Sequence, residues 1–208
     1  TDRKHWEARQ KLLLSELTHR VKNTLAVIQA IARQTLRSSK SNEEFIEHFD
    51  GRLAALSRAH SLLVETNWQG ANLASLARQE LEAYSTEQPS RLRIDGPPVI
   101  LPADLATPVG LVLHELATNA TKYGALSRRG GTVTLTWSLE PRNEAQVLHV
   151  LWQEQGGPPA KDPKRSGFGS VLIEGAIPGT TVKRDFLPEG LKCQLEIPLK
   201  RAPNGSSQ

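Results

Sequence analysis

One histidine near the start of the chain stands on a predicted helix, on the side away from its apolar face. Apolar residues recur every three or four positions from Leu17 to Ile28, which predicts an amphipathic helix. At about 100° per residue His19 points away from that face, beside the cations Arg20 and Lys22. An exposed imidazole can act as a nucleophile and carry a phosphoryl group, although a lone surface histidine is more often simply solvated.

A second set of polar side chains shares one face of another predicted helix. In "LVLHELATNATKYG" the spacing i, i+4, i+7 and i+8 aligns Glu115, Asn119, Lys122 and Tyr123. Carboxylate and amide oxygens suit Mg²⁺, which keeps waters and takes further ligands from phosphates. The ammonium could then meet a phosphate and the phenol a base. The alternative is an ordinary solvated helix face.

A loop rich in glycine and cations follows a predicted strand near residue 155. The segment "GGPPAKDPKRSGFGS" carries Lys161, Lys164 and Arg165, and "SGFGS" leads into a predicted helix whose first amides could hold phosphate oxygens. The loop matches neither the Walker pattern nor the complete dinucleotide-binding fingerprint. On its own it equally fits a flexible surface loop.

The composition restricts the classes of protein to which the chain can belong. The 208 residues suit one large domain or two small ones, with 38% hydrophobic residues and a formal net charge of +4. The single cysteine, Cys193, excludes an internal disulfide and a cysteine-based zinc site, so we expect a cytoplasmic protein. No apolar run approaches the ~18 residues of a membrane span. The scattered charges and the missing aromatic platform argue against nucleic-acid binding.

The first third of the chain is predicted to be a helical hairpin. Residues 2–37 contain neither Gly nor Pro and predict one long helix, and Ser41 or Asn42 can cap a second helix. Each helix can bury one apolar stripe against the other. We expect flanking apolar residues to stay exposed in a single hairpin, namely Leu13, Val27, Ile31 and Leu62. A second copy would cover them in a four-helix bundle, so a homodimer is predicted.

The rest of the chain mixes helices with strands. Helices are predicted over 71–85, 103–126 and 170–177, strands over 91–101, 131–140 and 146–154, and a β-hairpin turns at 187–190. This pattern predicts the α+β class, with the helical hairpin followed by an α/β sandwich. The absence of any methionine suggests that the chain is cut from a longer protein, and residues 201–208 are expected to be disordered.

Taken together, the motifs resemble one family, the HWE subclass of sensor histidine kinases. "ELTHRVKNTLAVIQAIARQTLR" resembles its phosphoacceptor helix, and "HELATNATKYGALS" its asparagine-containing box, in which His114 is the H of the subclass name. "LWQEQGGP" resembles its first glycine box, with Trp152 and Glu154 as the W and the E, and "GFGSVLIEG" resembles the second glycine box. The resemblance extends to about Leu199.

The resemblance implies a two-domain catalytic core. Residues 1–68 would form the dimerisation and phosphotransfer hairpin, and residues 69–200 an ATP-binding domain of the Bergerat type. The implied reaction is ATP-dependent autophosphorylation of His19, followed by phosphotransfer to an aspartate of a response regulator. An upstream sensor, for which a PAS-type domain is plausible, would precede the hairpin. The alternatives are a Bergerat-fold ATPase and a kinase-like adaptor that docks a receiver without phosphotransfer.

The resemblance also assigns roles to individual residues. Asn119 would bind Mg²⁺ with Glu115 as a second ligand, and Glu154 would accept a hydrogen bond from the adenine amino group. Trp152 suits structural packing as well as it suits a role in the site. Glu16 could substitute for an acid that many sensor kinases carry beside the phosphoacceptor, although a glutamate at this spacing is more often a solvated charge or a partner of Arg20. The remaining residues of the implied ATP site are His114, Lys122, Tyr123, Gly156, Gly157, Arg165, Gly167, Gly169 and Ser170.

Overall fold

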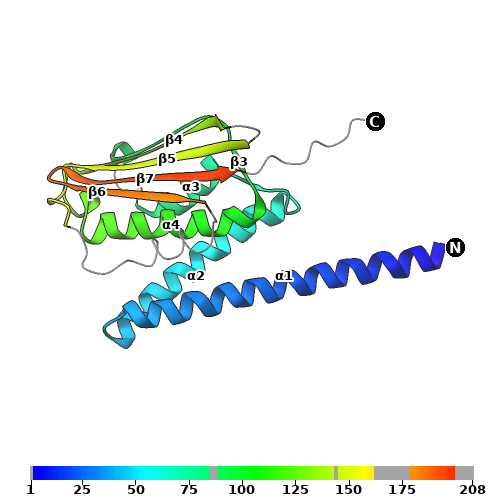
Figure 1. Cartoon of the computed structure of the whole chain (residues 1–208). Helices are drawn as coiled ribbons and strands as arrows, with labels where there is room; N and C mark the ends of the chain where they lie inside the picture. The colour runs from blue at the N-terminus through cyan, green and yellow to red at the C-terminus, as the bar shows by residue number, and fades with distance from the viewer. Residues whose placement is uncertain (1, 85–88, 143–144, 162–178, 200–208) are drawn as a thin grey trace. The chain divides into compact units, whose positions relative to one another are not determined.

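The computed structural model describes residues 2–84, 89–142, 145–161 and 179–199 (Figure 1). The chain divides into two compact units, Thr1–Leu53 and Ala54–Gln208, and the division falls inside the second helix. This division reflects packing, and the expected functional boundary between residues 68 and 69 stays a prediction. The second glycine box, the helix predicted over 170–177 and the tail 201–208 lie outside the described residues.

The two predicted hairpin helices are present, as α1 (Asp2–Ser38) and α2 (Asn42–Glu65). The turn between them is held by local side-chain capping. The Glu44 amide donates to the Ser41 hydroxyl at 3.2 Å, and the Glu44 carboxylate accepts from the Lys40 amide at 2.6 Å. Ser41 therefore caps α2, because its hydroxyl satisfies an amide that has no partner within the helix.

Burial in the first unit is concentrated near the turn. Ile31, Thr35 and Arg52 are buried, and the Arg52 guanidinium donates to the Thr35 hydroxyl at 2.7 Å. Leu17 is 58% exposed and Leu25 54% exposed. The expectation that this stripe is buried within the hairpin is therefore wrong, as is the expectation that Ile31 is exposed.

The second half of α2 belongs to the second unit. Its residues Ala59, Leu62 and Leu63 are part of the hydrophobic core of that unit. The prediction that Leu62 meets water is wrong for the same reason. Leu13, by contrast, is 58% exposed, as expected.

The second unit contains a five-stranded mixed sheet in the order β2-β4-β5-β7-β6. The strands are β2 (Leu92–Asp95), β4 (Thr132–Arg142), β5 (Ala145–Gln155), β6 (Thr181–Leu187) and β7 (Gly190–Leu199). The long strands pair antiparallel, including the predicted β6–β7 hairpin, whereas the edge strand β2 pairs parallel to β4. A separate two-stranded ladder joins β1 (Ala71–Asn72) to β3 (Ile100–Leu101).

Two helices, α3 (Leu73–Leu81) and α4 (Ala103–Lys122), lie on one face of this sheet (Figure 1). Alternate residues of the strands, such as Leu135, Leu148 and Trp152, point into the core that these helices complete. Short 3₁₀ turns occupy Glu82–Tyr84, Pro89–Arg91 and Ala125–Ser127. The α+β class and the layered architecture are confirmed.

Among the described residues, none of the helices combines the length and the apolar character that crossing a bilayer requires.

Candidate functional site

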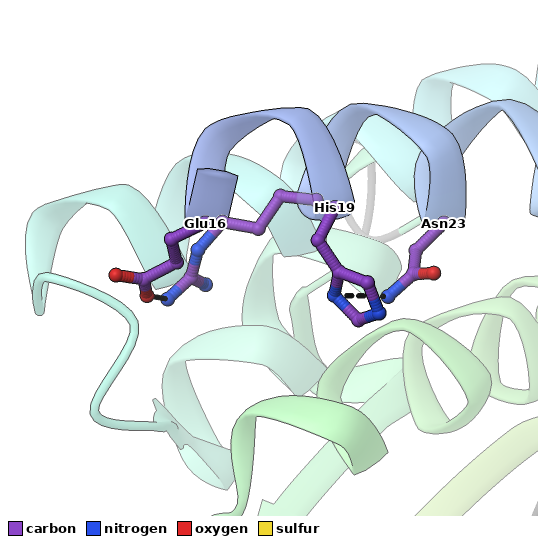
Figure 2. Close-up of polar contacts among 4 residues, drawn as sticks. Glu16, His19 and Asn23 are labelled. Atoms are coloured by element: carbon purple, nitrogen blue, oxygen red, sulfur yellow. Dashed lines mark hydrogen bonds and ion pairs between the residues drawn. The ribbon is translucent and has the colours of Figure 1, made fainter. Parts of the chain in front are cut away.

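His19 is exposed on α1, as the helical spacing predicts. Its ring nitrogen Nδ1 lies 3.4 Å from the side-chain amide nitrogen of Asn23, one turn further along the helix. Figure 2 shows the two side chains directed toward one another. When the amide NH₂ donates to Nδ1, the ring proton is on Nε2. If the amide turns by 180°, Nδ1–H donates to the amide oxygen and Nε2 carries the lone pair. The Asn23 amide is therefore coupled to the imidazole tautomer.

Glu16 is engaged by a neighbouring cation. Its carboxylate forms an ion pair with the Arg20 guanidinium across one helical turn. Glu16 is thus an ion-pair partner of Arg20, which is one of the roles that the sequence left open for it. Its assignment as an acid that assists proton removal at His19 stays a prediction.

The predicted polar stripe lies on the accessible side of α4. Glu115 is half-buried, Asn119 and Lys122 are exposed, and Tyr123 at the C-terminal end of the helix is 71% exposed. The opposite side is packed into the core by Leu113, Leu116 and Ala120. The stripe is therefore a solvent-facing surface on a helix whose other side is packed into the core, which leaves these side chains accessible to a ligand. His114 is half-buried beside it, and its role stays a prediction.

The oxygens on this stripe fit a magnesium ion. The Glu115 carboxylate and the Asn119 amide oxygen come from positions one turn apart, and both residues lie on the accessible face of α4. Mg²⁺ typically takes only one or two protein oxygens and completes its octahedron with water and phosphate. No cluster of three or more His, Cys, Asp or Glu that could hold a metal occurs among the described residues, so an all-protein metal cage is not found there.

Glu154 is nearly inaccessible, with 3% of its surface exposed, and both of its carboxylate oxygens have protein donors. The Ala125 amide donates to Oε2 at 2.8 Å, and the Trp152 indole Nε1–H donates to Oε1 at 3.0 Å. Burial raises the pKa of the Glu154 carboxyl, while the two hydrogen bonds act in the opposite direction. The fold thus brings the first glycine box against the residues that directly follow Tyr123.

The glycines of this region permit close backbone packing. A Cβ at Gly157 would lie 2.5 Å from the Ala125 Cα, and a Cβ at Gly124 would overlap the Glu154 carboxylate. Gly156 has φ +76°, a left-handed conformation that favours glycine. Packing of the turn after α4 therefore accounts for Gly156 and Gly157 without a phosphate, and their predicted role in a phosphate cradle stays a prediction.

Known proteins resemble this chain over most of its length. The HWE histidine kinase family model matches residues 16–98. A blue-light-activated histidine kinase of Brucella anthropi is 36% identical over 202 residues, which cover 96% of this chain. The chain belongs to the HWE histidine kinase family. It spans 41% of the length of the Brucella anthropi relative and 36% of that of a Brucella ovis relative with the same name, which is also 36% identical over 85% of this chain.

Solved structures of similar fold include the Erythrobacter litoralis EL346 blue-light-activated histidine kinase. That match has a TM-score of 0.60 at 18% identity, covering 89% of this chain and 58% of the other. The histidine kinase domain of the same protein matches with a TM-score of 0.52 at 16% identity, covering 86% of this chain and 94% of that domain. At this identity the similarity shows the fold alone.

In this member of the HWE histidine kinase family, Arg91 is an organising residue that the sequence did not reveal. Its guanidinium donates to the carbonyls of Gly131 at 2.8 Å and Arg128 at 2.6 Å, and more weakly to that of Ala125 at 3.3 Å. One side chain thereby holds the loop after α4 from the end of the short turn before β2. No sequence signal predicts these contacts, because the partners lie 34 to 40 residues away.

Four residues of the predicted phosphate site lie outside the described residues, namely Arg165, Gly167, Gly169 and Ser170. Elsewhere a groove of about 360 Å³ opens among strands β4 to β7, lined by residues that include Thr136, His149 and Glu196. These side chains alternate with core residues such as Trp137 and Val150, so they face away from the core. None of the predicted site residues lines this groove.

Proposed function

We propose that this chain is the catalytic core of a two-component kinase, which transfers the γ-phosphoryl group of ATP to His19 and then to an aspartate of a receiver domain. The observation that carries the proposal is the exposed His19 imidazole, with Asn23 at its Nδ1. Membership of the HWE histidine kinase family supports it. An ATPase does not require an exposed histidine at this point of the helix.

The phosphoryl step is a displacement at phosphorus. With the proton on Nδ1, the Nε2 lone pair attacks the γ-phosphorus, and a P–N bond forms while the P–O bond to the β-phosphate breaks. ADP leaves with the electron pair of the broken bond, and the solvent-exposed ring then releases its Nδ1 proton to water. An outward-facing histidine suits both stages, because the group must first meet a nucleotide and then a receiver domain.

The nucleotide would bind along the accessible side of α4. Asn119 and Glu115 would hold Mg²⁺, which supplies charge neutralisation for the phosphates when it is bound. The Lys122 ammonium would contact a phosphate, and the Tyr123 ring would pack against adenine. The Glu154 carboxylate would accept a hydrogen bond from the adenine 6-amino group, since each of its oxygens keeps a second acceptor site beside its protein donor.

The proposal is tested by incubating the chain with γ-labelled ATP and Mg²⁺. We expect a label that is lost in acid and retained in alkali, as a phosphoramidate bond requires. His19→Ala should abolish labelling and leave ADP binding intact. His60→Ala is the control, because His60 is half-buried with its ring edge-on to Trp68 and should not accept the label. A His19→Ala chain that still acquires the label would place the acceptor elsewhere.

The magnesium assignment has its own variant. Asn119→Ala should remove labelling, whereas Thr121→Ala on the same helix should retain it, because the Thr121 hydroxyl only donates back to the Ala117 carbonyl at 2.9 Å. Normal labelling of Asn119→Ala would refute the assignment of this helix to the metal. If Asn119→Ala and Thr121→Ala both retain the label while His19→Ala acquires none, His19 remains the acceptor and only the magnesium assignment fails.

A further inference from the structure

Trp152 contacts the same carboxylate that the proposed function assigns to adenine. Trp152 and Glu154 are two residues apart on β5, so both side chains emerge on the same face of the sheet. The tryptophan is 1% exposed, and its indole Nε1–H donates to Glu154 Oε1 at 3.0 Å. A buried indole N–H needs an acceptor, and for Trp152 that acceptor is the Glu154 carboxylate.

The Glu154 carboxylate is held at both oxygens. The second donor, the Ala125 amide, comes from the start of the short turn after α4, so the two donors reach the carboxylate from different elements. Gly124 adjoins Oε2, and a Cβ there would displace the carboxylate. Two fixed donors and a closely packed backbone together define one orientation of the carboxylate plane.

A defined orientation matters because a carboxylate otherwise rotates about its last side-chain bond. Each oxygen has two acceptor sites, and the protein donors occupy one on each oxygen. The directions of the remaining sites are then set by the fold. A hydrogen bond to a ligand contributes more binding free energy when its acceptor is already oriented, since no rotational freedom of the acceptor is lost on binding.

We infer that Trp152 is a positioning residue for nucleobase selection: its indole N–H orients the Glu154 carboxylate so that it accepts from a 6-amino purine and rejects a 6-oxo purine. The inference rests on the proposed role of Glu154. The oxygen of a 6-oxo group is itself a hydrogen-bond acceptor and cannot donate to the carboxylate. Hypoxanthine, which carries this group, is therefore the base to compare with adenine. Trp152 itself does not touch the nucleotide.

The chain offers a matched control in Trp137. This tryptophan is also buried in the core of the same unit, on the adjacent strand β4, and its indole N–H donates to the Pro97 carbonyl at 2.8 Å. Trp137→Phe and Trp152→Phe therefore remove the same atoms from similar surroundings. Only the second substitution removes a donor from the Glu154 carboxylate, whose Oε2 still accepts from the Ala125 amide.

The test measures the dissociation constants of ADP and IDP by calorimetry on the full chain. We expect ADP to bind more tightly, and the IDP-to-ADP ratio to fall about tenfold in Trp152→Phe, as for the loss of one oriented hydrogen bond. The ratio should not change in Trp137→Phe. The inference would be overturned if the IDP-to-ADP ratio of dissociation constants stayed unchanged in both variants, or if it fell equally in both.

Glu154→Gln separates this inference from the function on which it rests. If the chain binds ADP and IDP equally, or if Glu154→Gln keeps the full discrimination, the adenine role of Glu154 fails and the inference fails with it. If Glu154→Gln loses discrimination but Trp152→Phe keeps it, only the positioning role of Trp152 fails. Phosphorylation of His19 is a separate readout that neither result decides.

A measurement on the unsubstituted chain tests the inference even if one of the variants does not fold. The indole N–H signals of Trp152 and Trp137 are observable by ¹H–¹⁵N NMR and can be assigned from the two Phe variants or by selective labelling. We expect saturating ADP to shift the Trp152 indole signal and not that of Trp137, because adenine binding changes the charge distribution on Glu154. An unmoved Trp152 signal at saturating ADP would overturn the inference.

Discussion

The Arg58 guanidinium on α2 lies 2.5 Å from the Glu80 carboxylate on α3, and the two partners differ in their access to water. The Glu80 side chain is fully buried, whereas that of Arg58 is 34% exposed. Burial raises the pKa of Glu80, and the contact with Arg58 acts in the opposite direction. Glu80 Oε1 has no hydrogen-bond partner among the described residues. The pair thus joins α2 to α3 through a buried carboxylate, and Arg58 is the one cation paired with it in the described part of the chain.

The asymmetry predicts unequal costs of removing either partner. Arg58→Ala leaves a buried carboxylate without its cation and should lower the free energy of unfolding at pH 7 by about 3 kcal/mol. Glu80→Gln removes the buried charge and leaves an arginine that water can reach, so its cost should be about 1 kcal/mol or less. Urea unfolding of both variants and of the double variant measures this. A Glu80→Gln chain less stable than Arg58→Ala would contradict the prediction.

The same carboxyl predicts a pH dependence of stability. Because the folded-state pKa of Glu80 is raised, the folded chain holds this proton more tightly than the unfolded chain does. Its contribution is fully present below the ordinary glutamate pKa and is lost as the pH rises through the raised value. The free energy of unfolding of the native chain should therefore fall relative to Glu80→Gln over that window, and a constant difference across it would argue against the shift.

Asn23 should influence the rate at which His19 is phosphorylated. Asn23→Ala removes the partner of Nδ1 and should slow labelling about tenfold without changing the KM for ATP. Asn23→Asp keeps an acceptor for Nδ1–H, which leaves the lone pair on Nε2, and should stay within a few-fold of the native rate. Gln29→Ala, an exposed position on α1, is the control. The tautomer argument fails if the Ala and Asp variants are equally slow.

Arg91 should stabilise the loop after α4 in a way that lysine cannot reproduce. Arg91→Lys replaces a guanidinium that reaches the Gly131 and Arg128 carbonyls with a single ammonium, and should cost about 1–2 kcal/mol. Arg93→Lys is the control, since Arg93 and its partner Asp95 are both largely exposed. Hydrogen exchange at residues 125–131 should accelerate only in Arg91→Lys. Equal exchange in both variants would show that the loop does not depend on Arg91.

The exposed apolar side chains of α1 predict a homodimer. Leu14, Leu17, Val21 and Leu25 are each about half exposed, and such a stripe is typical of a helix that packs against a partner. Light scattering should give twice the chain mass of 22.9 kDa. The double variant Leu14→Glu/Leu25→Glu should be monomeric, whereas Ile100→Glu, at an exposed apolar position on β3, should not change the mass. A native chain that stays monomeric at high concentration rules the dimer out for this chain.

The sequence by itself was sufficient for features that depend on neighbouring residues. The long helix α1, the Ser41 cap and the β6–β7 hairpin follow from periodicity and turn residues within a few positions. The exposure of His19 follows in the same way, because the angle per residue of a helix is constant. The order of the motifs likewise indicated the family without any coordinates.

Only the tertiary structure decided which distant residues meet. Segments far apart in the chain meet in the parallel pairing of β2 with β4 and in the burial of Leu62. They also meet in the hydrogen bonds from Arg91 to the loop after α4. The Glu154 carboxylate is the clearest case, since one donor lies two residues away and the other 29. Strand alternation places Trp152 beside it, but the amide of Ala125 reaches it only because α4 packs on the sheet. Such contacts depend on how the layers pack, which no local pattern of residues specifies.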